Sequence, residues 1–428
     1  MKNIYRIFDL FLPVLTLFLL NLGLNNSVCN SHETIFALLA GALFVLGKQL
    51  LSGYDSYSNR TIAKKLEVTT KSWLLAVVIL VSVDYLFYVL NVFDNALFLL
   101  WFIATPILLF VSKIYIYRIY LKKFQKDFVW ILVGQEYEFL ELEKTRLAVN
   151  NIVIHQCPQC TIDELKEAVK QHRPSGILMN NNEKVSPEMV KLLTHCELSG
   201  IKLLSMEHFF ESFLRKCFIP YDVYGTNYLD QVRRLKGFKR TEKRVLDVSF
   251  SLFLIALTFP VMLYSLYKIR KESPGKILFQ QERVGLDAKT FKVMKFRTMH
   301  EDSHFDPYTQ KDDPRVFKYG NFMRKSRVDE LPQMFNVLRG DMHFCGPRTE
   351  WNILVEKYED EIPFYHVRHL VKPGITGWAQ VMYPYGANTE DARQKLMYDL
   401  YYIKHWSIWL DIEVLIRTVN VILGKKGI

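Results

Sequence analysis

Long apolar runs dominate the first part of the chain. Four of these runs are each close to the ~20 residues that a helix needs to cross the hydrocarbon core of a bilayer. They are residues 5–24, 34–51, 73–93 and 95–117. The second run is the weakest, because Lys48 and Gln49 fall near its end. The pattern predicts a four-helix transmembrane bundle within residues 1–125.

The charges around these runs predict their orientation. Lysine and arginine precede the first run, occur in loop 52–72 and follow the fourth run, whereas the loop 25–33 and the turn 91–95 contain neither. Loops rich in these residues stay on the cytosolic side. We therefore expect the N-terminus and everything after residue 118 to be cytosolic. We find no convincing signal-peptide cleavage site in the first run.

Short strand-like runs alternate with helix-like segments in residues 126–235. The strand-like runs are 128–133, 152–154, 176–179 and 201–204. Residues 161–170 open with a capping-box pattern from Thr161 to Glu164, and residues 186–193 open with Ser, Pro and an acid. Both are signals of a helix start. The alternation predicts a small Rossmann-like α/β domain with a parallel sheet.

The glycine fingerprint of a dinucleotide site is degenerate in this domain. A Rossmann site needs G-x-G-x-x-G after the first strand. Here Gly134 stands alone and is followed by Gln, Glu, Tyr and Glu, whose acids would repel a pyrophosphate. We therefore expect no dinucleotide here. A spacer, a dimerisation surface and a regulatory unit remain open as roles.

A fifth apolar segment, about residues 245–268, is long enough to span a membrane but is expected to be re-entrant. Pro260 lies in its middle and should kink or break a helix. Basic clusters lie at both ends, and a spanning helix would export one of them. The cluster at 233–244 suggests a collar that faces lipid headgroups. Asp247 should pair with a nearby cation, because an isolated charge there would be costly.

Composition narrows the classes of function. The chain has 428 residues, enough for two or three domains, and a net charge of +11. With four apolar runs in front, this charge favours anionic lipid and phosphorylated substrates over nucleic acid. Five of its six cysteines fall in the expected cytosolic part and should be reduced thiols. The lone C-x-x-C at Cys157 and Cys160 is better explained as loop cysteines than as a metal or redox site.

The acid pair Asp329–Glu330 is the strongest candidate for chemistry. Pro332 follows it, apolar residues then recur at helical spacing, and Gly340 can end the helix. The pair is therefore expected near a helix N-terminus, where free N–H groups favour anions such as phosphate. Taken alone, the pair is better explained as capping acids, because acids at helix starts are common.

Several motifs surround this pair and together resemble one family. They are Lys243–Asp247 at the start of the re-entrant segment, Q-x-R-x-G at Gln281–Gly285, K-F-R-T-M at Lys295–Met299, V-D-E-L-P-Q-x-x-N-V-L at Val328–Leu338, G-P-R at Gly346–Arg348, and P-G-I-T-G at Pro373–Gly377. This block, about residues 236–428, resembles the bacterial sugar transferases, which are polyprenyl-phosphate sugar-1-phosphate transferases. The four N-terminal runs and the degenerate α/β domain resemble the long members of that family.

The resemblance implies a fold and a reaction. It implies a bacterial inner-membrane protein of mixed α and α/β class, with a mainly α catalytic domain at 236–428 on the cytosolic side. The enzyme would transfer a sugar-1-phosphate from a UDP-sugar to undecaprenyl phosphate and release UMP, which initiates capsule, exopolysaccharide or O-antigen synthesis. Membrane lipid would be a partner and nucleic acid would not. The sugar and the oligomeric state are open, with a homodimer among the options.

The resemblance also implies roles for individual residues. Asp329 would attack the sugar-linked phosphate and form a phosphosugar-aspartyl intermediate, and Glu330 would hold Mg²⁺. Other residues would contact phosphate or uridine, and arginine suits such contacts because it binds phosphate in a bidentate manner. These residues are Arg348, Lys295, Arg297, Arg283, Arg315 and Pro347.

Two departures and two alternatives accompany this interpretation. Thr349 replaces a usual proline, and Lys318–Tyr319 replaces a usual Thr-Arg pair, which puts a substrate contact in doubt. One alternative is a non-catalytic scaffold for polysaccharide assembly, against which the intact acid pair argues. The other is a membrane-anchored nucleotide-sugar oxidoreductase or epimerase, against which the missing glycine fingerprint argues.

Overall fold

The computed structural model describes residues 2–25, 29–51, 53–54, 62–87, 95–116, 128–158, 160–180, 186–219, 232–301, 313–384, 386 and 388–423. These residues divide into two compact units. One comprises Met1–Leu132 with Glu136–Gly176, and the other comprises Val133–Gln135 with Ile177–Ile428. The boundaries expected at residues 125 and 235 stay predictions, because residue 125 lies outside the described ranges and neither coincides with a boundary between these units.

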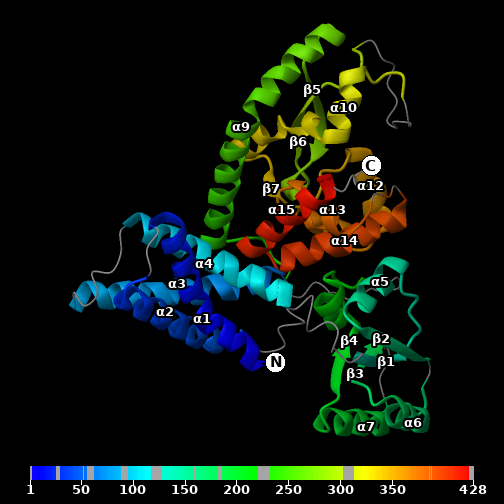
Figure 1. Ribbon diagram of the computed structural model, residues 1–428. Coiled ribbons are helices and arrows are strands. Elements are labelled where there is room, and N and C mark those ends of the chain that lie inside the picture. Colours follow the sequence, from blue (N-terminus) through cyan, green and yellow to red (C-terminus); the bar gives the residue numbers. More distant parts are fainter. Residues whose placement is uncertain are drawn as a thin grey trace. The chain divides into compact units, whose positions relative to one another are not determined.

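The N-terminal apolar runs form helices that pack around a shared aromatic core. The helices are α1 (Lys2–Asn25), α2 (Ser31–Leu50), α3 (Ile62–Phe87) and α4 (Asn95–Ile116). α1 lies against α2 and α4, and α2 lies against α3 (Figure 1). Trp73 and Trp101 meet at the centre, with ring centroids 5.1 Å apart. Length and composition make α1, α2 and α9 (Phe238–Glu272) candidates for crossing a membrane, while the apolar part of α4 is shorter.

The charged Lys48 in the second apolar run is neutralised by an ion pair. Lys48 is buried, and its Nζ lies 3.1 Å from Oδ2 of Asp9 on α1. The hydroxyl of Tyr54 donates to the same carboxylate oxygen at 2.7 Å. Charges inside a helical bundle are tolerated when they pair in this way.

The expected α/β elements are present in the middle of the chain. The strands are β1 (Phe128–Gly134), β2 (Ile152–Pro158), β3 (Gly176–Asn180) and β4 (Lys202–Ser205). They form one sheet in the order β2-β1-β3-β4. The N–H of Ser175 bonds to Val129 at the start of β1, and the N–H of Gln135 bonds to Asn180 at the end of β3, so these neighbours run parallel.

The helices of this region begin at the predicted caps. Thr161 and Glu164 form the capping box of α6 (Ile162–His172), and Ser186 caps α7 (Pro187–Leu198). The sequence did not predict α5 (Glu141–Val149), α8 (Met206–Phe209) or the π-helix η4 (Phe210–Leu214). The prediction of reduced thiols was wrong for one pair, because Cys157 and Cys160 form a disulfide.

The second unit contains the motifs that surround Asp329–Glu330. β5 (Leu278–Val284) and β6 (Thr290–Phe296) form an antiparallel hairpin, in register from Leu278 opposite Phe296 to Val284 opposite Thr290. Two shorter strands, β7 (His343–Cys345) and β8 (Gly374–Thr376), pair in parallel. The other elements after β5 are helical: η6 (Leu286–Ala288), α10 (Lys318–Ser326), η7 (Val328–Glu330), α11 (Gln333–Arg339), α12 (Asn352–Glu361), η8 (Tyr365–Leu370), α13 (Trp378–Met382), α14 (Thr389–Lys404) and α15 (Ile408–Leu423).

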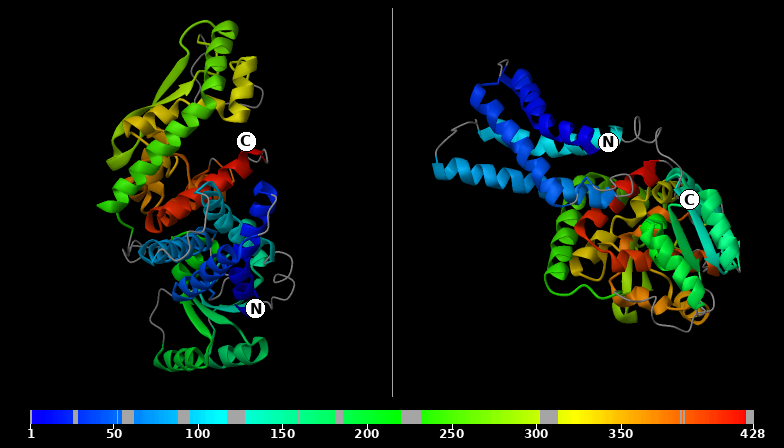
Figure 2. Two further views of the ribbon diagram at one scale, coloured as in Figure 1. Left: turned by 60° about the vertical axis from the view of Figure 1, so that its left-hand side comes forward. Right: turned by 90° about the horizontal axis from the view of Figure 1, so that it is seen from below.

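Helix α9 runs along one side of these elements (Figure 1 and Figure 2). It continues through Pro260, so the expected break does not occur. Near its start, Lys243 and Asp247 are buried, and Lys243 Nζ lies 2.7 Å from Asp411 on α15. Asp247 pairs with Lys243 at 3.2 Å and with His343 at 2.6 Å, as expected for a charge that needs a partner. The basic collar at 233–244 therefore does not include Lys243.

Candidate active site

The acid pair lies in the short turn between α10 and α11. Asp329 and Glu330 belong to the 3-10 helix η7, and Pro332 stands at the N-cap of α11. α11 has seven residues and is capped at its C-terminus by Gly340, whose φ of 91° is in the left-handed region. The pair therefore precedes a helix as expected. Because α11 is so short, nearby cations dominate the electrostatics of the pair more than a helix dipole does.

Side chains from other elements hold α11 in place. Oδ1 of Asn336 accepts the N–H of Met294 at 3.0 Å, and its Nδ2 donates to the carbonyl of Lys292 at 2.8 Å. Asn336 thus joins α11 to strand β6. At the other end, Arg244 donates to the carbonyls of Val337 and Leu338. These contacts explain why Asn336 and Arg244 occur in the motifs, and they fix the turn that carries the acids.

Three cations surround Glu330. Its Oε1 lies 3.2 Å from Nζ of Lys295 on β6, 3.5 Å from Nη2 of Arg348 and 3.6 Å from Nη1 of Arg327. Burial alone would raise the pKa of Glu330, but these three cations outweigh it and lower the pKa to about 2. Glu330 is therefore ionised and forms ion pairs with all three cations.

Asp329 has a different environment from its neighbour. Burial raises the pKa of Asp329 to about 6, and repulsion by Glu330 adds to this rise, against the pull of Lys295, Arg327 and Arg324. Among the described residues, its buried Oδ1 has no hydrogen-bond partner. A buried carboxylate oxygen without a partner is unusual in a folded protein and is often found at functional sites. Asp329 is thus a comparatively basic carboxylate with an open oxygen.

The loop that carries Arg348 is built by close backbone contacts. The N–H of Gly346 bonds to Thr376 at 2.9 Å, and the N–H of Gly374 bonds to the carbonyl of Pro347 at 2.8 Å. A Cβ on Gly374 would lie 2.1 Å from the nitrogen of Gly346, so only glycine permits this approach. Pro347 therefore contributes through its carbonyl to the packing of the loop.

Arg368 fixes the same loop from behind. Its Nη2 donates to the carbonyl of Arg348 at 2.9 Å and to Oδ2 of Asp399 at 2.9 Å, and its Nη1 donates to the hydroxyl of Tyr365. Arg368 and Asp399 are both buried. Arg368 was missed in the sequence, because no motif marks it and two of its three partners lie 20 and 31 residues away.

The structure brings together only some of the predicted cations. Lys295 and Arg348 lie at Glu330. Arg283 stacks over Trp351, 5.6 Å from the ring centroid, and Glu330 is among the charges that act on it. Arg327 and Arg324 also act on the pair and were not predicted as site residues, although both precede it in its own segment.

Two predicted arginines have structural partners instead. Arg297 donates to the carbonyls of Lys276 and Pro274 and to the hydroxyl of Ser273, so it holds the turn after α9. Arg315 forms a buried ion pair with Asp313, with Nη2 2.6 Å from Oδ2. Tyr319, at the departing Lys318–Tyr319 position, bonds to Ser265 on α9 at 2.9 Å. That departure therefore affects the packing of α9.

The donor set fits a hard divalent cation. Asp329 and Glu330 are adjacent carboxylates, one with an unpartnered oxygen, and carboxylate oxygens are preferred ligands of Mg²⁺. Asp329 Oδ1 is the oxygen without a partner among the described residues, whereas Glu330 already faces three cations. The expectation that Glu330 holds Mg²⁺ stays a prediction.

Sequence comparisons place the second unit among known proteins. Residues 238–425 match the family model described as bacterial sugar transferase. A UDP-N-acetylgalactosamine-undecaprenyl-phosphate N-acetylgalactosaminephosphotransferase of Aeromonas hydrophila is 45% identical over 187 residues, which cover 43% of this chain and 44% of that protein. A UDP-glucose:undecaprenyl-phosphate glucose-1-phosphate transferase of Caulobacter vibrioides is 42% identical over 185 residues, which cover 42% of this chain and 69% of that protein.

A third relative carries a different sugar in its name. The undecaprenyl-phosphate galactose phosphotransferase of Salmonella typhimurium is 35% identical over 209 residues, which cover 45% of this chain and 42% of that protein. The match thus spans less than half of the Aeromonas and Salmonella proteins. The three names specify three sugars at similar identity, so overall likeness does not choose among them.

Proposed function

The chain belongs to the bacterial sugar transferase family, and from this we propose that it transfers a sugar-1-phosphate from a UDP-sugar to undecaprenyl phosphate, releasing UMP. The observation that carries the proposal is the contrast within the acid pair. Glu330 is ionised and surrounded by cations, whereas Asp329 is buried, comparatively basic and has an open oxygen. The product would initiate synthesis of a surface polysaccharide.

The proposed mechanism has two displacements at one phosphorus. First, Asp329 Oδ1 attacks the sugar-linked phosphorus, the bond to the UMP oxygen breaks, and UMP leaves. A phosphosugar-aspartyl intermediate remains. An oxygen of undecaprenyl phosphate then attacks the same phosphorus and displaces the Asp329 carboxylate. Covalent catalysis of this type replaces one difficult step by two easier ones.

The chain's own residues supply most of the electrostatics. Lys295 and Arg348 lie at Glu330, where they can neutralise charge that develops on the phosphoryl oxygens. The raised pKa of Asp329 makes its ionised form a stronger nucleophile than an ordinary aspartate. Mg²⁺ held by Glu330 would supply further charge neutralisation. Arg368 positions Arg348 and does not touch substrate.

The packing of α9 supports a catalytic unit at the membrane surface. Asp247 near its start packs on β7, and Ser265 near its end packs on α10. The catalytic elements therefore accompany α9 along its length, and a membrane crossing would carry charged α10 into lipid. The opposite face exposes Phe253, Leu257 and Tyr264. We propose that α9 does not cross the inner membrane but lies with this apolar face against its cytosolic surface, in a chain that multiple N-terminal crossings anchor.

The α/β domain gives little support to an oxidoreductase. After β1, helix α5 presents Glu141 and Glu143 in its first turn, and Glu143 occupies the N–H of Leu140 at 2.8 Å. These acids stand where a Rossmann site would bind pyrophosphate.

Trapping the intermediate tests the proposal directly. Full-length protein in lipid nanodiscs is incubated with Mg²⁺ and UDP-sugars labelled in the β-phosphate, without undecaprenyl phosphate. We expect one labelled sugar phosphate on Asp329 with release of UMP, and discharge of the label when lipid is added. Asp329→Asn should do neither, whereas Asp360→Asn, which changes an exposed acid on α12, should behave as wild type. UMP release by Asp329→Asn would contradict the assignment of the nucleophile.

A further inference from the structure

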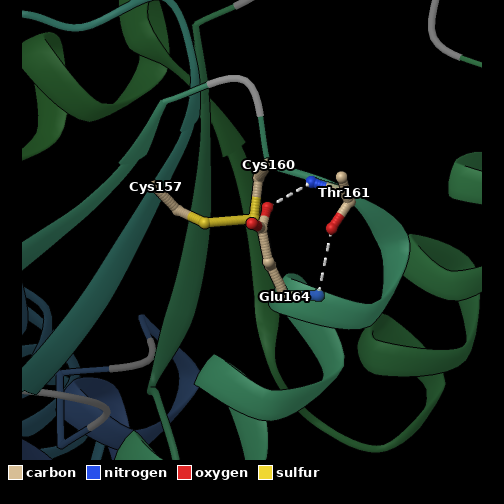
Figure 3. The surroundings of a disulfide bond; sticks show 4 residues. All are labelled: Cys157, Cys160, Thr161 and Glu164. Atoms are coloured by element: carbon tan, nitrogen blue, oxygen red, sulfur yellow. Dashed lines mark hydrogen bonds between the residues drawn. A yellow bond between two sulfur atoms is a disulfide. The ribbon is translucent and has the colours of Figure 1, made fainter.

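The disulfide of the α/β domain lies where a strand passes into a helix (Figure 3). Cys157 is near the end of β2, and Cys160 directly precedes Thr161, the N-cap of α6. β2 is an edge strand of the sheet, and Cys157 is partly exposed. The bond is thus on an accessible edge of the domain.

A purely structural role explains this bond poorly. A disulfide stabilises a fold mainly by restricting the unfolded chain, and this effect is smallest for short loops. Here the sequence separation is only three residues. The topology proposed above also places the domain in the cytosol, where thiols are normally kept reduced and disulfides are usually transient, catalytic or redox-sensing.

Glu164 adds a charged group to the pair. The sulfur atoms of Cys157 and Cys160 and a carboxylate oxygen of Glu164 all lie within 4.8 Å of one another. The carboxylate is held there by the capping box, since it accepts the N–H of Thr161 at 2.8 Å while Thr161 Oγ1 accepts the N–H of Glu164 at 3.3 Å (Figure 3). The hydrogen bonds from Thr161 lower the pKa of Glu164. Glu164 is therefore a fixed carboxylate beside both sulfurs.

We propose that Cys157 and Cys160 form a thiol–disulfide exchange site that cycles between a disulfide and two thiols by reaction with an external dithiol. Three independent features carry this inference: the bonded pair, its position before α6 and the fixed carboxylate of Glu164. The site is separate from the acid pair, and its chemistry needs no sugar substrate.

The exchange balances as a two-electron reaction. A thiolate of the external dithiol attacks Cys157 Sγ, the bond between Cys157 and Cys160 breaks, and Cys160 leaves as a thiolate. The N-terminal end of α6 favours that negative charge. The second thiolate of the dithiol then attacks its own bound sulfur and releases Cys157. Two electrons and two protons pass to the pair, and the dithiol leaves as a disulfide.

Glu164 is assigned a part in the reverse direction. When the pair is oxidised again, one cysteine must lose its proton before it attacks. The Glu164 carboxylate lies within 4.8 Å of both sulfurs, so its charge disfavours that thiolate. The reduced pair would therefore be held mainly as thiols, and its reoxidation would be slowed.

A redox titration tests the site in the intact protein. Full-length protein in nanodiscs is equilibrated with buffers from reduced to oxidised glutathione, quenched in acid, alkylated and analysed by peptide mass spectrometry. We expect the peptide with Cys157 and Cys160 to gain or lose two alkyl groups together and reversibly. Peptides with the buried cysteines Cys196 and Cys345 should not change. Cys157→Ser and Cys160→Ser should abolish the paired change, and Cys196→Ser should leave it intact.

Three outcomes would overturn the proposal. The pair could stay oxidised in excess dithiothreitol, or stay reduced in oxidised glutathione. The reduced pair could instead bind one zinc ion per chain and resist oxidation, which would identify a metal site. UMP release is not a readout here, so failure leaves the transferase proposal untouched.

Glu164 is tested by a matched pair of variants. Glu164→Gln keeps an acceptor for the N–H of Thr161 but removes the charge. Asp163→Asn removes a charge from the same turn, where the side chain is 93% exposed and pairs with Lys166. Alkylation of the reduced pair at neutral pH should be roughly four-fold faster in Glu164→Gln, as expected for loss of one charge within 4.8 Å in water-like surroundings. Equal rates in the two variants would refute the role of Glu164.

Discussion

Replacement of Asp329 by asparagine should stabilise the protein at neutral pH although it abolishes transfer. The pKa of Asp329 is raised from 3.8 to about 6, chiefly by burial. A shift of this size corresponds to roughly 3 kcal/mol. Because the folded-state pKa lies above the unfolded value, the stabilising contribution of protonated Asp329 is complete below about pH 4 and is lost as the pH rises through about 6.

The net gain is smaller than the full electrostatic cost. Asparagine removes the buried charge but leaves an amide that also needs partners, a cost of about 1–2 kcal/mol. We therefore expect a gain of about 1–2 kcal/mol at pH 7.5, and no gain at pH 4, where the carboxyl group is already protonated. For a unit of this size, that corresponds to a rise in Tm of about 2–8 °C.

Thermal unfolding in nanodiscs, followed by tryptophan fluorescence at pH 4 and pH 7.5, measures this difference. Asp360→Asn serves as the control, because its side chain is exposed on α12. It should shift Tm by the same small amount at both pH values. If Asp329→Asn were no more stable than wild type at pH 7.5, or if its gain were equal at both pH values, the raised pKa would be refuted.

The rate of intermediate formation, measured by single-turnover labelling, should fall about ten-fold per pH unit below about pH 6, because only ionised Asp329 attacks. If the rate began to fall only near pH 4, the raised pKa of Asp329 would be contradicted. Asn336→Ala should lower the free energy of unfolding by about 1–3 kcal/mol in denaturation assays, because the N–H of Met294 and the carbonyl of Lys292 lose their partner. Asn336→Asp should not restore this stability, since an aspartate cannot donate to the carbonyl. Arg368→Gln should reduce kcat/KM, because Arg368 positions Arg348, but it should not change the pH below which the rate falls. A change in that pH would instead indicate that Arg368 contacts the acids directly. Arg297→Gln should lower Tm but leave the KM for UDP-sugar unchanged, because Arg297 holds the turn after α9. A raised KM would show that Arg297 contacts the substrate after all.

Elements with local signals were predictable from the sequence. The caps of α6 and α7 are written in two or three adjacent residues, and both helices begin where those residues predict. The strands of the α/β domain followed from short apolar runs. Helix α5 was missed because it is short and mostly polar, so its sequence has no clear apolar stripe.

Site residues were predictable only where they belong to a recognisable motif or where their partners are close in the sequence. Lys295 and Arg297 lie two residues apart in the same basic motif, yet one meets Glu330 and the other meets the turn after α9. Nothing in the sequence distinguishes them, because their partners come from distant segments. The same reason hides Arg368. The disulfide was also missed, because a single C-x-x-C is compatible with several chemical states.

The buried pair between Lys243 and Asp411 has a consequence for the order of synthesis. The two residues are 168 positions apart, so α9 leaves the ribosome long before α15 exists. At a synthesis rate of 5–20 residues per second, this interval is about 8–34 s. During it, Lys243 has Asp247, one turn away, as a partner, and the apolar face of α9 has no folded catalytic unit beside it. The nascent helix therefore has time to settle at the membrane first, and the catalytic unit is completed on an anchor that is already in place.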